Sequence, residues 1–262
     1  MDDKTIPGAQ TLFRGLAVIE AVAAGARTLA SIGGAIGCTR STTQRLASAL
    51  LQAGYLRNDP GRGYVLGPKL IQFGFQAREQ MPLAAIARPH LEALAARTED
   101  TVHLGIPEGS EVLYLDKLPG QRGLEMRSRV GHRMPIALTG VGKALMLDMD
   151  AAEWRRLYDV GLHHPGSRGT PLPWPEYRAR MEGYRAAGAT IDLAENEIGI
   201  HCVAAPVRDA GGGIVAAISV ASAAPYMSEA RMQSLVPDVI AAARAVSREL
   251  GWKVGTTGQD AA

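Results

Sequence analysis

The chain has 262 residues, a hydrophobic content of 47% and a formal net charge of +2. These values are ordinary for a globular protein and leave room for one small and one medium domain. Met1 leads into a short acidic segment and no long apolar run, so we expect neither a signal peptide nor a membrane span. The two cysteines, Cys38 and Cys202, lie far apart, which indicates a reducing cytoplasm rather than a disulfide framework.

Residues 10–67 have the pattern of three helices followed by a hairpin. Apolar residues at three- and four-residue spacing predict a first helix with a buried face formed by Leu12, Leu16, Ile19 and Val22. Residues 28–36 predict a shorter second helix. The third helix follows Gly37, and its spacing predicts a buried face formed by Leu46, Ala49, Leu50 and Ala53. This order is typical of a winged helix-turn-helix domain.

The leading turns of the third helix are polar and basic. Thr39 or Ser41 is a suitable N-cap, because a hydroxyl can accept a backbone N–H that the first turn leaves unpaired. Side chains placed here can approach phosphates and reach base edges in the major groove. The predicted contact residues are Arg40, Ser41, Thr42, Thr43, Gln44 and Arg45.

A hairpin follows Gly54, which suits the end of the third helix. Two short apolar runs, residues 55–57 and 64–66, flank a turn-rich segment over residues 58–63. We expect this hairpin to be the wing, with Arg57 and Arg62 on DNA phosphates.

Charge is unevenly distributed along the chain. Residues 5–78 contain eight basic and two acidic side chains, so this part carries +6 and the remainder of the chain is slightly acidic. Phosphate neutralisation supplies most non-specific DNA affinity, so a basic end on an acidic body favours a DNA-binding function. The alternative hypothesis is a small helical subdomain whose polar face is only solvated.

The second part of the chain alternates helical and strand patterns. We expect a linker helix over residues 68–81 and a domain over residues 82–252, with tails at residues 1–9 and 253–262 that are disordered. Strands are predicted at residues 101–106, 111–118, 123–128, 190–193, 202–207 and 214–221. Helices are predicted at residues 83–97, 140–149, 151–158, 174–187 and 228–250. Two hairpins with surrounding helices indicate an α+β fold with an antiparallel sheet.

Two stretches of this domain are candidates for binding or chemistry. Residues 138–144 place glycines and the Thr139 hydroxyl at a helix start, which suits either an anion or close packing. They lack P-loop spacing, and the histidines and cysteines of the chain lack metal-ligand spacing, so we expect no cofactor and no metal.

Residues 192–202 lead from acidic side chains into a strand carrying Cys202. A thiol nucleophile with His103 or His201 as base is possible, but His201 and Cys202 point to opposite faces of a strand, which favours an unreactive thiol.

Four segments together resemble the IclR family of bacterial transcriptional regulators. They are residues 38–51, residues 55–67, residues 131–135 with 139–144, and residues 199–207. The resemblance implies an N-terminal winged helix-turn-helix, a linker helix and a C-terminal GAF-like domain that binds an effector. It also implies a dimer or a dimer of dimers on a palindromic DNA operator, with a small organic acid or aromatic effector.

Carried over position by position, the family's effector pocket falls on six residues: Thr139, Gly140, Val141, Asp192, Cys202 and Ser219. Family members often have a serine at the position of Ala221 and a histidine at the position of Ala137. Their absence favours a less polar ligand, such as an aromatic or longer-chain acid.

We therefore expect a ligand-responsive, sequence-specific DNA-binding regulator in the cytoplasm that is not an enzyme. Two other classes remain as alternatives: a cysteine-dependent hydrolase using Cys202, and a small-molecule sensor that does not bind DNA. An apolar or aromatic anchor is typical of a protein-binding surface, and residues 40–45 contain none.

Overall fold

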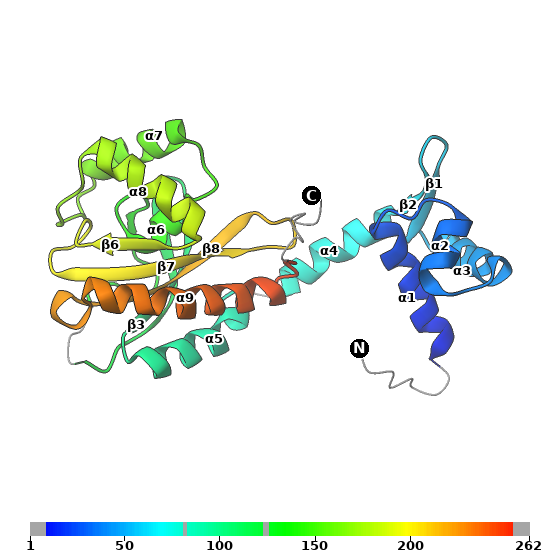
Figure 1. The fold of residues 1–262 in the computed structure, drawn as a ribbon, viewed down its shortest axis with the longest axis horizontal. Helices are drawn as coiled ribbons and strands as arrows, with labels where there is room; N and C mark the ends of the chain where they lie inside the picture. The colour runs from blue at the N-terminus through cyan, green and yellow to red at the C-terminus, as the bar shows by residue number, and fades with distance from the viewer. Residues whose placement is uncertain (1–8, 81–82, 123–125, 254–262) are drawn as a thin grey trace, which may run out of the picture. The chain divides into compact units, whose positions relative to one another are not determined.

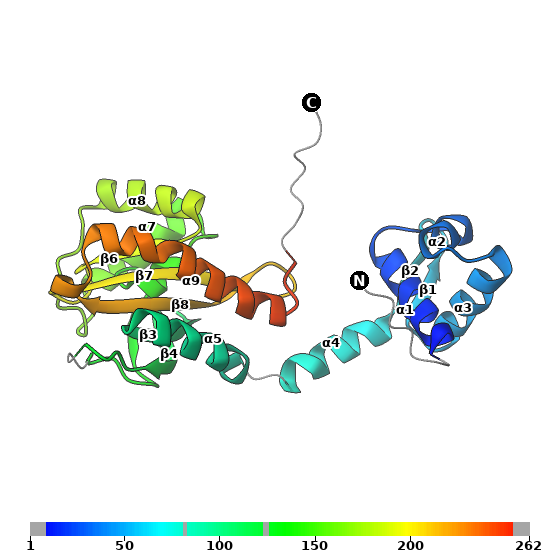
Figure 2. The same ribbon diagram turned by 60° about the horizontal axis from the view of Figure 1, so that its bottom comes forward.

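The computed structural model describes residues 9–80, 83–122 and 126–253. The chain divides into two compact units, residues 1–82 and residues 83–262 (Figures 1 and 2). Residues 1–8 and 254–262, nearly all of the two predicted tails, lie outside the described residues.

The first unit contains the predicted helices and hairpin in the predicted order. Its elements are α1 (Gln10–Ala23), α2 (Leu29–Ile36), α3 (Arg40–Gln52), β1 (Leu56–Asp59), β2 (Gly63–Leu66) and α4 (Pro68–Gln80). The antiparallel pairing of β1 and β2 forms the hairpin. The core of this unit contains the buried apolar side chains Val18, Val22, Ile32 and Leu56.

Local hydrogen bonds explain where these elements begin and turn. Thr28 and Ser31 form a capping box at the start of α2, and the Thr39 side chain accepts the Thr42 N–H to cap α3. Thr39 is thus the N-cap of α3. At the hairpin tip, Asp59 Oδ1 accepts the N–H groups of Gly61 and Arg62, both at 3.0 Å. This Asx-type turn fixes the backbone of the hairpin at Arg62.

Thr43 was predicted to face DNA, and this prediction is wrong. Thr43 is fully buried, as is Ala47, whereas Ala49 and Ala53 are exposed. A Cβ added to Gly33 would lie 3.0 Å from Thr43 Oγ1, so α2 and α3 pack closely at this position. The buried face of α3 therefore includes Thr43 and Ala47 rather than Ala49 and Ala53.

The predicted buried face of α1 is also partly wrong. Leu12 is 63% exposed and Leu16 46% exposed, and Phe13 beside them is 46% exposed. Only the second half of α1 packs on the core, through Val18 and Val22. The first half therefore presents an apolar surface, which we call the α1 apolar surface and define as Leu12, Phe13 and Leu16.

The second unit is an antiparallel sheet with helices on both faces. The sheet has the strand order β5-β4-β3-β8-β7-β6, and every neighbouring pair is antiparallel. The strands are β3 (Thr101–Glu108), β4 (Glu111–Leu118), β5 (Arg133–Pro135), β6 (Thr190–Leu193), β7 (Ile200–Arg208) and β8 (Ile214–Ala223). The helices are α5 (Leu83–Thr98), α6 (Gly140–Leu145), α7 (Ala151–Leu162), α8 (Trp174–Ala187) and α9 (Glu229–Glu249).

Because alternate side chains of a strand point to opposite faces, the sheet has a hydrophobic core on each face. On β7, Val203, Ala205 and Val207 join the core beneath α5 and α9, and Cys202 and Ala204 join the core beneath α6, α7 and α8. Figure 1 shows these two groups of helices on opposite faces of the sheet. Because both faces are covered, β7 and β8 are almost continuously buried. The predicted α+β fold class is confirmed.

Two predicted elements differ from the structure. The strand expected at residues 123–128 is absent from its described part, residues 126–128, because the carbonyls of Met126 and Ser128 accept hydrogen bonds from Lys117 Nζ instead of a strand partner. The strand that pairs with β4 at this edge of the sheet is β5. The helix expected at residues 140–149 ends at Leu145.

Gly142 provides a stability test of the α6 region. A Cβ at Gly142 would lie 2.0 Å from Ile136 O and 2.6 Å from Thr139 Oγ1. Gly142→Ala is therefore expected to lower the free energy of unfolding by about 1–3 kcal/mol, measured by urea denaturation. Gly183→Ala in α8 is the matched control, because no atom lies within 4 Å of the added Cβ. It is expected to raise stability by about 0.5–1 kcal/mol, and equal effects of the two substitutions would contradict this packing.

Candidate functional site

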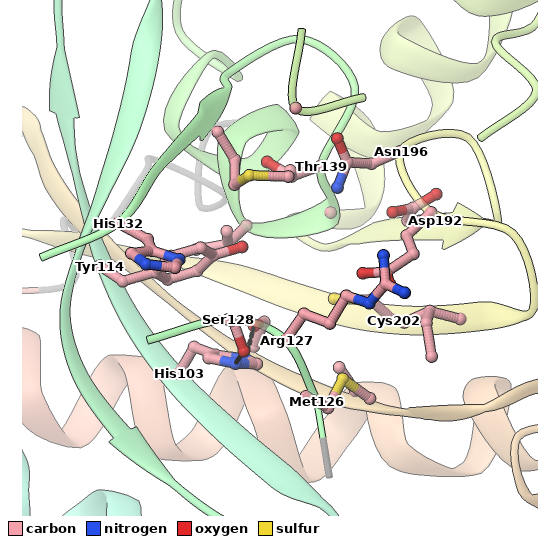
Figure 3. A pocket seen from close by; sticks show the side chains of 18 of the residues that line it. His103, Tyr114, Met126, Arg127, Ser128, His132, Thr139, Asp192, Asn196 and Cys202 are labelled. Carbon is pink, nitrogen blue, oxygen red and sulfur yellow. Dashed lines mark hydrogen bonds and ion pairs between the residues drawn. The ribbon is translucent and has the colours of Figure 1, made fainter. Parts of the chain in front are cut away.

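A cavity of about 230 Å³ lies between the sheet and the segments that cover it on the α6 side (Figure 3). Its walls come from all six strands of the sheet, from the start of α6, and from loops around residues 126–132, 166–168 and 194–200. These segments are distant in sequence, and antiparallel pairing brings them together.

Strand register explains which residues meet in the cavity. Asp192 on β6 is opposite Cys202 on β7, and Cys202 is opposite Ala221 on β8. In a neighbouring row, Ser219 on β8 is opposite His103 on β3. Two rows of side chains therefore form the cavity wall that the sheet supplies.

All six effector positions predicted from the resemblance line this cavity: Thr139, Gly140, Val141, Asp192, Cys202 and Ser219. Several further lining residues were not predicted. They include His103, Tyr114, Arg127, Ser128 and Asn196. His103 carried a usable signal, because it alternates with the apolar residues Val102 and Leu104, which lie on the opposite face of β3. The loop residues carried none.

Ala137, where the resemblance suggested a missing polar group, is not part of the cavity. It is fully buried in the core, and its carbonyl accepts a hydrogen bond of 2.9 Å from Tyr177 Oη. The absence of a histidine there therefore says nothing about ligand polarity.

A neutral histidine connects two hydroxyls in the cavity. His103 Nε2 lies 2.7 Å from Ser128 Oγ, and His103 Nδ1 lies 3.4 Å from Ser219 Oγ. Burial, with a smaller contribution from Lys117, lowers the pKa of His103 to about 3. The imidazole is therefore uncharged at neutral pH and can both donate and accept a hydrogen bond.

A buried ion pair supports the acidic end of the cavity. Lys143 Nζ lies 2.6 Å from Glu195 Oε1 and 2.8 Å from the Ile191 carbonyl, and both charged side chains are 1% exposed. Burial lowers the pKa of Lys143, but Glu195 and Asp192 outweigh burial, so the pKa is raised overall. Asp192 Oδ1 in turn accepts the Glu195 N–H at 2.8 Å. The pair thus joins α6 to the loop after β6.

The carboxyl group of Asp192 is buried away from water. Burial raises its pKa to about 6, whereas the Lys143 ammonium acts in the opposite direction. Ionising Asp192 therefore costs the folded state stability. The loss develops as the pH rises from the unfolded-state pKa, near 3.8, through the folded-state value.

Asp192→Asn is expected to stabilise the protein at pH 7.5 by up to about 3 kcal/mol, because the amide is never ionised. At pH 4, close to the unfolded-state pKa of 3.8, most of this difference should be gone, since Asn keeps an acceptor for the Glu195 N–H. Urea denaturation of both proteins between pH 4 and pH 8 measures the difference. A stability difference that does not change with pH would contradict the raised pKa.

Cys202 lacks the properties of a nucleophile. Burial raises the pKa of its thiol to about 12, although hydrogen bonds with the Ser219 side chain and the Val141 backbone lower it. His201 points away from the cavity side of β7, and its Nδ1 lies 2.8 Å from the Met227 carbonyl. The other histidine considered as a base, His103, is also unsuited to generate a thiolate, because its pKa is lowered to about 3.

The start of α6 packs closely against β6 and β7. Gly142 N–H donates to Thr139 Oγ1 at 3.0 Å, and Val141 N–H faces the Cys202 sulfur. A Cβ at Gly140 would lie 2.7 Å from Cys202 Sγ and 3.3 Å from Asp192 Cβ. The glycine sequence here therefore permits close packing of α6 against β6 and β7.

In the first unit, the polar side of α3 and the hairpin tip are open to solvent. Arg40, Ser41, Gln44 and Arg45 are exposed, and Thr42 is half-buried. Arg62 at the hairpin tip is exposed, and Arg57 lies 3.7 Å from Asp59. Within the described ranges, Arg40, Arg45 and Arg62 have no carboxylate within 4.0 Å. Their charge is therefore available to a polyanion.

Among the helices of the described residues, none is long and apolar enough to cross a bilayer.

Comparison with known proteins identifies the family. Residues 75–248 match the model of the bacterial transcriptional regulator IclR C-terminal domain, and residues 11–60 match the IclR helix-turn-helix domain. Over 253 residues the chain is 31% identical to the DNA-binding transcriptional repressor YiaJ of Escherichia coli K12, covering 94% of this chain and 90% of YiaJ. It is 30% identical over 218 residues to the transcriptional regulator XynR of the same organism, covering 83% of this chain and 86% of XynR.

Solved structures show the same fold. The repressor BlcR of Agrobacterium tumefaciens superposes with a TM-score of 0.76 at 22% identity, covering 95% of this chain and all of BlcR. Thermotoga maritima IclR gives a TM-score of 0.60 at 26% identity, covering 93% of this chain and 99% of that structure. With the family model matched over most of the chain, this protein belongs to the IclR family and is a DNA-binding transcriptional regulator.

Proposed function

We propose that this regulator binds a palindromic operator and that a small organic acid or aromatic metabolite in the cavity of the second unit changes its affinity for that operator. The observation that carries the proposal is the cavity itself. It places buried polar side chains from β3, β6 and β8 around one space, and the cavity thiol of Cys202 is unsuited to act as a nucleophile.

On the DNA side, the exposed leading turns of α3 are the recognition surface. Arg40, Ser41, Thr42, Gln44 and Arg45 supply it, and Arg57 and Arg62 of the hairpin contact phosphates. Thr43 does not belong to this surface, because it is buried against Gly33 of α2.

The proposed regulation also requires two copies of the chain to associate. Exposed apolar side chains on a helix favour a protein partner, and a palindromic operator requires two copies of the domain. The α1 apolar surface is therefore proposed as a contact between two chains, as a dimer or a dimer of dimers in the cytoplasm. Ligand binding would change the separation of the paired α3 helices through the linker helix α4.

The salt dependence of binding tests the hairpin contact. Arg62→Ala is expected to weaken binding to a random-sequence duplex and to lower the slope of log K against log salt by about one unit. Fluorescence anisotropy between 50 and 300 mM salt measures this slope. Arg156→Ala in α7, whose guanidinium pairs with Glu153 at 2.6 Å, is the control and should leave the slope unchanged. A slope unaffected by Arg62→Ala would remove the hairpin from the DNA contact.

A further inference from the structure

We propose that Arg27 is a positioning residue for DNA binding: its side chain fixes the hairpin of β1 and β2 against the end of α1, and it does so without contacting a phosphate itself. Arg27 is exposed and is one of the eight basic side chains of residues 5–78, so its charge alone would suggest a direct DNA contact. The inference rests on the proposed contact of the hairpin with phosphates, and it adds a residue that holds the hairpin in place for that contact.

The backbone and the side chain of Arg27 both bond to the same residue of the hairpin. The Tyr64 N–H donates to the Arg27 carbonyl at 2.9 Å, and Arg27 Nη1 donates to the Tyr64 carbonyl at 3.3 Å. Tyr64 lies near the start of β2, two residues after Arg62 at the hairpin tip. Arg27 therefore holds both polar groups of the backbone at the point where β2 leaves the tip.

The same guanidinium group also bonds to the end of α1. Arg27 Nη1 donates at 2.8 Å to the carbonyl of Val22, in the last turn of α1, where the partial negative charge of the helix end favours a cation. The Val22 side chain is fully buried in the core of the first unit. One nitrogen of Arg27 therefore connects the hairpin to the core, and it is directed at carbonyls of the protein.

Gly63 shows how closely the hairpin approaches Arg27. A Cβ at Gly63 would lie 2.3 Å from the Arg27 carbonyl oxygen, and the backbone of Gly63 has a φ of +75°, which favours glycine. The hairpin can therefore reach Arg27 because residue 63 has no side chain. Gly61 at the tip differs, since the atom nearest to its added Cβ is Asp59 Oδ1 at 3.7 Å, an ordinary contact.

Arg27 lies close to both of the surfaces proposed to contact DNA. It lines a surface groove that also includes Tyr64 of the hairpin and Cys38 and Arg40 at the start of α3. Two contact surfaces reinforce each other only where their separation lets both engage DNA at once. Arg27 thus contributes to DNA affinity by fixing the hairpin at this separation from α3.

Hydrogen–deuterium exchange of the full chain without DNA tests the structural step. Arg27→Met removes the side-chain donors and keeps an aliphatic side chain, so it should speed exchange in the hairpin, residues 56–66, by about fivefold or more and leave exchange in α3, residues 40–52, unchanged. Gly63→Ala should also speed exchange in the hairpin, whereas Gly61→Ala is the matched control and should not. Unchanged exchange of the hairpin in Arg27→Met, or an equal increase in α3, would overturn the inference.

A double-mutant cycle on DNA binding separates positioning from direct contact. Arg27→Met should weaken binding to a random-sequence duplex by about fivefold in the wild type, but by less than about twofold in a protein that already carries Arg57→Ala and Arg62→Ala. A phosphate contact by Arg27 itself would cause the same loss in both proteins. Equal losses, or no loss in the wild type, would overturn the inference and leave the hairpin contact in place. If Arg57→Ala with Arg62→Ala does not weaken binding, the proposed hairpin contact fails and the inference fails with it.

Discussion

Lys143→Met is expected to lower the free energy of unfolding by about 3–5 kcal/mol, because it leaves the buried Glu195 carboxylate without its partner. The two side chains are each 1% exposed, and Lys143 Nζ also donates to the Ile191 carbonyl. Urea denaturation at pH 7 measures the loss. Since the pair joins α6 to the loop after β6, the same change should also weaken ligand binding in the cavity.

A double substitution separates the charge from the packing. Lys143→Met combined with Glu195→Gln removes both charges, so it should recover at least half of the stability lost in the single variant. Glu182→Gln provides a surface comparison. It breaks the exposed Arg178–Glu182 pair at 3.0 Å and should cost less than about 0.5 kcal/mol. A similarly small loss in Lys143→Met would show that the buried pair contributes little.

Replacing both Arg40 and Arg45 by Ala is expected to weaken operator binding by about 2–6 kcal/mol, since each contact to a base or phosphate contributes about 1–3 kcal/mol. Both side chains are exposed on the leading turns of α3 and have no carboxylate partner among the described residues. Fluorescence anisotropy with an operator selected from a random library measures the change.

Two controls accompany this variant. Arg244→Ala, on an exposed position of α9, should leave operator affinity unchanged. Thr43→Ala should lower stability, because Thr43 is buried against Gly33 and its hydroxyl donates to the Thr39 carbonyl at 3.0 Å. Operator binding that is insensitive to Arg40 and Arg45 together would show that another surface contacts DNA.

The elements were predictable where a local signal sets them. The spacing of apolar residues located α1, α2 and α3, and turn residues located the hairpin. The buried face of a helix was less predictable, because the spacing of small side chains such as alanine fits more than one face. Ala49 and Ala53 fit the spacing of a buried face as well as Ala47 does, and only the close packing of Gly33 against Thr43 determines which face of α3 is inside.

The cavity was only half predictable. Residues in recognisable segments, such as Asp192, Cys202 and Ser219, were found. His103, Ser128 and Asn196 were missed because their places depend on strand register and on loops that follow tertiary contacts. Lys143 was overlooked because a lysine in a glycine-rich segment gives no sign that its ammonium is buried against a glutamate 52 residues away.

The central claim is that the cavity controls DNA binding, and one measurement tests it most directly. The dissociation constant of the full chain for its selected operator is determined with and without a saturating small organic or aromatic acid that binds the wild type, for wild-type protein and for Arg127→Ala, a substitution in the cavity lining. We predict a change of at least fivefold for the wild type, and for Arg127→Ala a response that requires a correspondingly higher ligand concentration. An operator affinity that is the same with and without bound ligand would contradict the account.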